Sequence, residues 1–186
     1  MPTLRRTLAF DFEAVADGIC KKLIFRHPHV FGDVTVSGTD EVLSNWEDLK
    51  REEKSQQTYT DTLNAVAKSL PALWRAEKVQ KKAKKAGFDW PDAQGAVDKL
   101  SEELSELREA IAQGTNVEEE LGDLLFAAVN VSRFVHADPE ETLNAATEKF
   151  ISRFAKVEEL AKAQGQDMAQ MSLTELDKLW EAVKRT

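Results

Sequence analysis

The sequence lacks the features that stabilise secreted and membrane-spanning proteins. Cys20 is its single cysteine, so no internal disulfide can form, and we expect a buried or half-buried thiol in a reducing compartment. No apolar run approaches the roughly 20 residues that a membrane span needs. No uninterrupted apolar segment follows the basic residues near the N-terminus, which argues against a signal peptide. The protein is therefore predicted to be cytoplasmic and to have no membrane partner.

Glycine and proline are also scarce, with 8 and 5 among 186 residues, whereas charged residues make up 31% of the chain. This composition is typical of helical proteins. Acidic residues outnumber basic ones, and the formal net charge is −8. That charge argues against a nucleic-acid partner, because tracking a phosphate backbone needs a basic surface. A single nucleotide needs only a local site and stays compatible with this composition.

Helix signals dominate the chain, and no alternating segment is long enough to build a sheet. Pro71 occupies a favoured first-turn position, and Asn116 with Glu119 and Ser172 with Glu175 form capping-box patterns. Four helices are predicted at about 12–25, 40–54, 71–87 and 91–114. A fifth helix should begin after Asn116, a sixth should begin at Asp138, and a last helix should run from Ser172 through Trp180. One short extended piece is predicted at 34–36 and an exposed connection at 51–60.

These signals predict an all-α protein. Residues 71–160 are expected to form a four-helix bundle with short loops, preceded by extra N-terminal helices. We divide the chain into an N-terminal helical segment and linker, residues 1–68, and a C-terminal domain, residues 69–186. The helix after Asn116 is apolar around most of its circumference, so we expect it to be central.

Acidic residues are concentrated in two motifs, Glu102-Glu103-x-x-Glu106 and Glu120-x-x-Asp123. An i, i+3 pair places two carboxylates side by side on a helix surface. The helices that carry the motifs are joined by a short turn at Gly114, so they should be antiparallel neighbours whose carboxylates converge. The leucine stripe of the first of these helices should form the core seam, with Glu103 at its margin. This stripe consists of Val97, Leu100, Leu104, Leu107 and Ile111.

Converging carboxylates repel one another, and each like-charged pair at ~4 Å costs several kcal/mol at a surface-like dielectric. A cation must offset that repulsion, and ligands that are all oxygen suit Mg²⁺ or Mn²⁺. A di-iron bundle would need Glu-x-x-His, and none of His27, His29 and His136 stands in that relation. The other acids of the region are expected to form an ordinary solvated face; these include Glu102, Glu109, Glu118 and Glu119.

The two acidic motifs in this order resemble the metal signature of the MazG family of all-α nucleoside triphosphate pyrophosphohydrolases. Four further stretches carry the resemblance over nearly the whole chain: RHPHVFGDV (26–34), SLPALWRAEKVQKKAKKAGFDW (69–90), EEELGDLLFAAVNVSRF (118–134) and ATEKFISRFAKVE (146–158). The resemblance implies a homodimer that hydrolyses a nucleoside triphosphate to the monophosphate and pyrophosphate, with Mg²⁺, or Mn²⁺ in its place, and a metal-activated water as nucleophile.

The resemblance also implies roles for individual residues. The metal ligands and catalytic carboxylates would be Glu103, Glu106, Glu120 and Asp123. The substrate-binding residues would be Lys149 and Arg153 for the phosphates, with Lys99 and Trp180 contacting the nucleotide. The proton of the attacking water could pass to a carboxylate, and both Glu102 and Glu106 are candidates.

One departure from the family concerns the number of acidic modules. Longer members carry two copies, whereas this chain has one, and its start resembles the last helix of a first copy, so the chain looks N-terminally shortened. The alternative hypothesis is therefore a non-catalytic, dimeric helical interaction or regulatory remnant of the same family. A metal-dependent thermal shift discriminates the two, because only a working site is stabilised by metal and nucleotide.

Overall fold

The computed structural model describes residues 12–34 and 57–185, and between these ranges only residues 38, 42, 45, 46, 49 and 53. Its contacts divide the chain into two compact units, residues 1–65 and 66–186. All regular elements in the described ranges are helices, so the all-α prediction is confirmed. No helix of the described residues is long and apolar enough to cross a membrane.

The first unit contains three described helices: α1 (Phe12–Arg26), α2 (Pro28–Phe31) and α4 (Tyr59–Asn64). Arg26 ends α1 and is buried, because it pairs with Glu53 at 2.7 Å and lies over the Trp46 ring. Cys20 is exposed on α1, so the expectation of a buried thiol is wrong. Most of the predicted helix at 40–54 and of the extended piece at 34–36 lies outside the described residues, and the five described residues of 40–54, at 42, 45, 46, 49 and 53, are helical.

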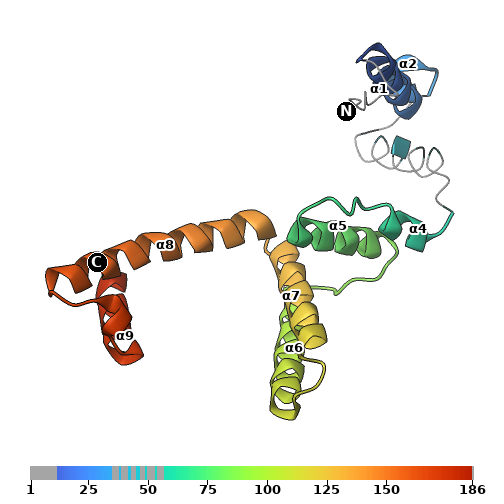
Figure 1. Cartoon of the computed structure of the whole chain (residues 1–186). Coiled ribbons are helices and arrows are strands. Elements are labelled where there is room, and N and C mark those ends of the chain that lie inside the picture. The colour runs from blue at the N-terminus through green and yellow to red at the C-terminus, as the bar shows by residue number, and fades with distance from the viewer. Residues whose placement is uncertain are drawn as a thin grey trace, which may run out of the picture. The chain divides into compact units, whose positions relative to one another are not determined.

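The second unit contains α5 (Ala72–Lys85), α6 (Ala93–Gln113), α7 (Val117–Phe134), α8 (Pro139–Ala163), the short 3₁₀ helix η1 (Met168–Gln170) and α9 (Leu173–Lys184). Two pairs of helices dominate its packing, since α6 lies along α7 and α8 lies against α9 (Figure 1). Helix α5 contacts both α7 and α8, whereas α7 and α8 touch each other only slightly.

Several predicted helix ends are confirmed. Asp138 caps α8 by accepting a hydrogen bond from the Glu141 amide, and Ser172 and Glu175 form the predicted capping box of α9. The capping box predicted at Asn116 is wrong, because Asn116 adopts a left-handed conformation, with φ of 55°, and makes no side-chain cap. Part of the predicted connection at 51–60 is instead the start of α4, which Thr58 and Asp61 cap reciprocally.

The buried face of α6 differs from the predicted leucine seam. Its buried residues are Ala96, Glu103 and Ala110, whereas Leu104 and Ile111 of the predicted seam are 41% and 60% exposed. Small alanine side chains allow α6 to approach α7 closely, and this pairing places Glu103 in the contact rather than at its margin. The leucines would be covered only by a further helix, which the described part of this chain does not supply.

Helix α7 is likewise less enclosed than its apolar sequence predicts. Ala127 and Val129 are its buried residues, while Leu121, Leu125 and Phe126 are each about half exposed. Helix α8 leaves a similar apolar surface uncovered, formed by Leu143, Phe150, Ile151 and Phe154. Helix α7 is central in that it contacts α5, α6 and α8, but it is not enclosed, and large apolar faces remain open in the second unit.

Hydrogen bonds fix the start of α8 on α5. The Trp74 indole Nε1 donates to both carboxylate oxygens of Asp138, at 2.8 and 2.9 Å, and the Leu73 amide donates to Glu140 at 3.3 Å. The Glu141 amide and the Trp74 indole both lower the pKa of Asp138. Helix α8 is thereby anchored to α5 and packs further along on α9, which explains its slight contact with α7.

Candidate metal and nucleotide site

The turn between α6 and α7 sets up the acidic motifs. Gly114 ends α6 with a left-handed conformation, φ of 68°, which glycine adopts without steric cost. Asn116 adds a second left-handed residue immediately before α7. This short connection makes α6 and α7 neighbouring antiparallel helices, as predicted, and directs both acidic motifs to the α6–α7 contact.

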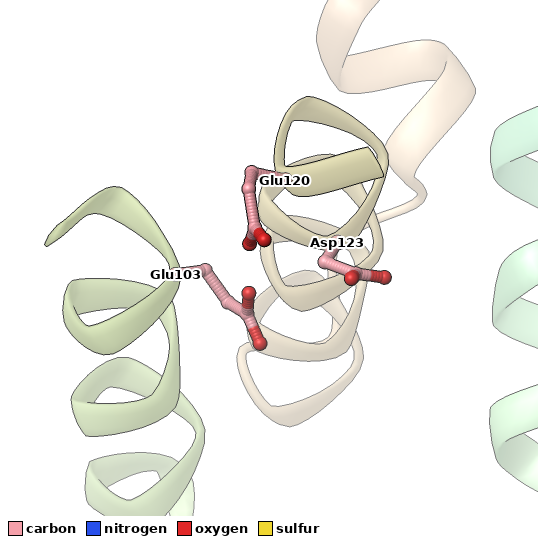
Figure 2. A group of neighbouring side chains, drawn as sticks. All are labelled: Glu103, Glu120 and Asp123. Atoms are coloured by element: carbon pink, nitrogen blue, oxygen red, sulfur yellow. The ribbon is translucent and has the colours of Figure 1, made fainter. Parts of the chain in front are cut away.

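Three of the four predicted metal ligands converge. Glu103, Glu120 and Asp123 each offer a carboxylate oxygen, and these three oxygens lie within 4.8 Å of one another. Figure 2 shows Glu103 reaching from α6 towards α7, where Glu120 and Asp123 stand one turn apart. Glu103 is buried, Glu120 is half-buried and Asp123 is exposed, so the group is open to solvent on one side. The predicted convergence of the two motifs is therefore found for these three residues, which we call the carboxylate cluster.

The fourth predicted ligand, Glu106, lies one turn beyond Glu103 on α6 and is exposed. It does not belong to the group of three. Its pKa is raised, first by desolvation and then by the negative charge of Glu103. The spacing places Glu106 one turn from Glu103, so the charge of Glu103 acts on it.

Lys99 is the cation that contacts the cluster. Its ammonium lies 2.7 Å from Glu102 and 2.8 Å from Glu103, one helical turn away on α6. These two hydrogen bonds, with Glu102 contributing most, raise the pKa of Lys99. The positive charge of Lys99 therefore offsets part of the repulsion within the cluster.

The other predicted substrate-binding residues lie on the α8–α9 pair. Lys149 is exposed and Arg153 half-buried on α8. Trp180 on α9 is half-buried and packs on the Phe150 ring at 5.2 Å, beside a small core of Val157, Ala161, Leu179 and Val183. The structure thus gathers these three residues on one helix pair and the carboxylates on another.

Sequence reasoning missed a buried ion pair at the end of α7 that lies away from the carboxylate cluster. Arg133 on α7 donates to both oxygens of Asp89, in the loop before α6, and to the Asn130 side chain. The side chains of Arg133 and Asp89 are only 7% and 12% exposed, and the Arg133 hydrogen bonds lower the pKa of Asp89. This contact ties the α5–α6 loop to α7. The sequence signal for a buried charge was Arg133 itself, which stands at the end of a mostly apolar helix.

Replacing Arg133 with methionine is expected to destabilise the second unit by about 3 kcal/mol, because the buried Asp89 would lose its close ion pair and keep the longer contact with Lys84, at 3.7 Å. The corresponding fall in Tm is roughly 10 °C for a chain of this size. Thermal unfolding followed by circular dichroism measures it. Arg108→Met, at an exposed position of α6, is the matched control and should leave Tm within about 1–2 °C of the parent protein. Equal Tm values for the two variants would show that the ion pair adds no stability.

A second missed contact joins α5 to α7. Gln80 is buried on α5, and its Nε2 donates to the Phe126 carbonyl at 2.8 Å. Its Oε1 has no hydrogen-bond partner among the described residues. A polar residue followed by two lysines gave no sequence signal for burial. Together, Gln80 and Arg133 tie α7 to α5 and to the α5–α6 loop.

Comparison with models of protein families gives a match that includes the acidic motifs. The model of the MazG nucleotide pyrophosphohydrolase domain matches residues 3–31 and 92–158. The second stretch includes all three residues of the carboxylate cluster and both α8 cations, Lys149 and Arg153.

Individual relatives resemble the chain over nearly its whole length. It is 42% identical to the nucleoside triphosphate pyrophosphohydrolase of Escherichia coli K12 over 180 residues, which cover 95% of this chain and 68% of that protein. Identity is also 42% to the nucleoside triphosphate pyrophosphohydrolase/pyrophosphatase MazG of Thermotoga maritima, over 95% of this chain and 67% of the relative. It is 46% to the YabN protein of Bacillus subtilis, over 95% of this chain and 37% of that protein.

Proposed function

This chain belongs to the MazG nucleotide pyrophosphohydrolase family, and we propose that it hydrolyses nucleoside triphosphates to the monophosphate and pyrophosphate in a Mg²⁺-dependent reaction. The observation that carries the proposal is the convergence of Glu103, Glu120 and Asp123 within 4.8 Å. We propose that residues 69–186 form the pyrophosphohydrolase domain.

The donor set suits a hard divalent cation. All ligands offered by the cluster are carboxylate oxygens, and the cluster is open to solvent on the side of Asp123. Mg²⁺ takes a few carboxylates and keeps waters and substrate phosphates in its remaining positions, and Mn²⁺ uses the same ligand types. Glu106, beside Glu103, would complete a four-carboxylate site if its side chain turned towards the cluster.

When bound, a divalent cation would neutralise charge on the phosphate oxygens and lower the pKa of a water, so that the water can lose a proton and attack phosphorus as hydroxide. The chain's own residues would then position the reactants. Glu103, Glu120 and Asp123 would fix the site at the α6–α7 contact. Glu102 and Glu106 are the candidates to accept the proton of the attacking water, and Lys149 and Arg153 would hold the phosphates in line.

We propose that the working form is a homodimer. Lys149, Arg153 and Trp180 lie on the α8–α9 pair, while the carboxylates lie on α6 and α7, and α8 is anchored at its start to α5. Exposed apolar side chains surround both groups, Leu121 and Leu125 near the acids and Phe150 and Phe154 near the cations. Apolar faces of this extent mark interaction surfaces. A second copy could lay its α8 across α6 and α7, close a four-helix bundle and bring its cations to the carboxylates.

Product analysis tests the proposed activity. The protein is incubated with ATP and Mg²⁺, and the nucleotides, phosphate and pyrophosphate are separated by anion-exchange chromatography. We expect AMP and pyrophosphate in equal amounts, and no hydrolysis when the metal is chelated. Formation of ADP and phosphate would assign the protein to another class of hydrolase. No hydrolysis of any nucleoside triphosphate, together with no metal-dependent thermal shift, would favour the non-catalytic remnant.

A further inference from the structure

We propose that Lys99 is a built-in counter-ion that occupies the carboxylate cluster in the absence of metal and moves to the polyphosphate when metal binds, thereby coupling the two binding events. This inference rests on the proposed metal-dependent function. It assigns to Lys99 a role in metal binding that goes beyond contact with the nucleotide.

The contacts of Lys99 carry the inference. Its ammonium lies 2.8 Å from Oε1 of Glu103, the buried member of the cluster, and 2.7 Å from Oε1 of Glu102. The side chain of Glu103 is only 9% exposed, so this carboxylate has little water to solvate its charge. Burial of an unpaired carboxylate is costly. Lys99 therefore stabilises the arrangement of Glu103 before any metal arrives.

The same contact opposes metal binding. A divalent cation must approach a carboxylate oxygen to about 2.0–2.1 Å, and the ammonium of Lys99 occupies one oxygen of Glu103. A metal ion in the cluster would also repel the ammonium, because two cations would lie beside the same buried carboxylate. Through this repulsion, a metal ion at Glu103 displaces the ammonium of Lys99.

Lys99 can make this movement. Its side chain is 35% exposed, and a lysine has a flexible four-carbon stem that carries a point charge. If metal binds alone, the displaced ammonium loses the buried Glu103, keeps only the exposed Glu102 as a carboxylate partner and otherwise gains water. If metal and triphosphate bind together, the ammonium gains phosphate oxygens. Metal binding should therefore be weak alone and strong with nucleotide, and by linkage the nucleotide affinity depends on the metal to the same extent.

Titration calorimetry with Mn²⁺ tests the coupling in the parent protein and in Lys99→Met. We expect the variant to bind Mn²⁺ alone about 5- to 20-fold more tightly, because no cation has to be displaced. In the parent protein, saturating α,β-methylene-ATP should strengthen Mn²⁺ binding by a factor within the usual 5- to 150-fold range of coupling between sites. This factor should fall at least about 5-fold in Lys99→Met. Mn²⁺ bound to the free analogue is measured separately and subtracted.

Two further variants serve as controls. Arg108→Met removes one positive charge from an exposed position of the same helix and should leave Mn²⁺ affinity within about 2-fold of the parent value, because salt screens distant charges. Lys99→Arg keeps a cation in reach and should keep the weak binding of Mn²⁺ alone. Circular dichroism confirms that each variant is folded.

The outcomes separate this inference from the proposed function. If the parent protein binds Mn²⁺ and Lys99→Met binds it equally or more weakly, the counter-ion role is wrong while the metal site stands. If Lys99→Met and Arg108→Met tighten Mn²⁺ binding equally, the loss of one positive charge anywhere on α6 explains the effect, and the counter-ion role of Lys99 is again wrong. If the parent protein binds no Mn²⁺ with or without the analogue, the proposed function itself fails.

Discussion

Replacing Glu120 with glutamine is expected to lower kcat by at least about 10³-fold, which corresponds to about 4 kcal/mol of lost transition-state stabilisation. Glutamine has nearly the same shape, but it lacks the negative charge that a divalent cation needs from its ligand. Glu120 lies in the group of three carboxylates within 4.8 Å. Its loss would leave Glu103 and Asp123 as the only charged members of the cluster, so metal affinity and turnover should fall together.

The measurement is the rate of pyrophosphate release at saturating Mg²⁺, with Mn²⁺ affinity measured in parallel. Glu119→Gln is the matched control, because Glu119 is adjacent in sequence, exposed and outside the cluster. It should keep kcat within about 2-fold of the parent value, since substitutions away from a site have small effects. Full activity of Glu120→Gln would remove the carboxylate cluster from the mechanism.

The carboxylate cluster could be predicted because its determinants are local. The i, i+3 spacing of Glu120 and Asp123 fixes their common face on any helix, and Gly114 marks a turn short enough to make α6 and α7 neighbours. The starts of α8 and α9 followed from the same kind of signal, since Asp138 and the pair Ser172 and Glu175 act within a single turn of backbone.

The packing could not be predicted in the same way. Helix α6 carries two stripes that could face a neighbour, one of leucines and one that contains Ala96, Glu103 and Ala110. Hydrophobicity alone selects the leucines, but the tertiary pairing with α7 selects the stripe with small residues. The bond from Trp74 to Asp138, which determines where α8 lies, joins residues 64 positions apart and leaves no periodic signal.

Two exposed apolar surfaces need to be covered, the leucines on α6 and α7 and the phenylalanines on α8. Each surface would cost free energy if it stayed in water, at about 25 cal/mol for each Å² of apolar area. Each also lies on the helix pair that holds one part of the predicted site, Leu125 with the acids and Phe150 with the cations. Covering the apolar faces and completing the site are therefore one event in the proposed homodimer.

Subunit mixing tests whether a second copy completes the site. We expect Glu120→Gln and the double variant Lys149→Met/Arg153→Met to be inactive alone and to regain up to about a quarter of the parent activity when mixed and allowed to exchange. Random exchange makes about half of the dimers mixed. Each mixed dimer would then have one site built from the intact carboxylates of one chain and the intact cations of the other, which is one site in two.

The control for this experiment is a mixture of Glu120→Gln with Asp123→Asn, two variants altered on the same helix. Their mixed dimers contain no intact carboxylate cluster, so no activity should return. Light scattering shows whether the parent protein is a dimer, and mass spectrometry of differently tagged chains shows that exchange occurred. Mixed dimers that form without recovering activity would mean that α8 supplies its cations to the carboxylates of its own chain. That result would require the bond between Trp74 and Asp138 to open so that α8 could fold back along α7.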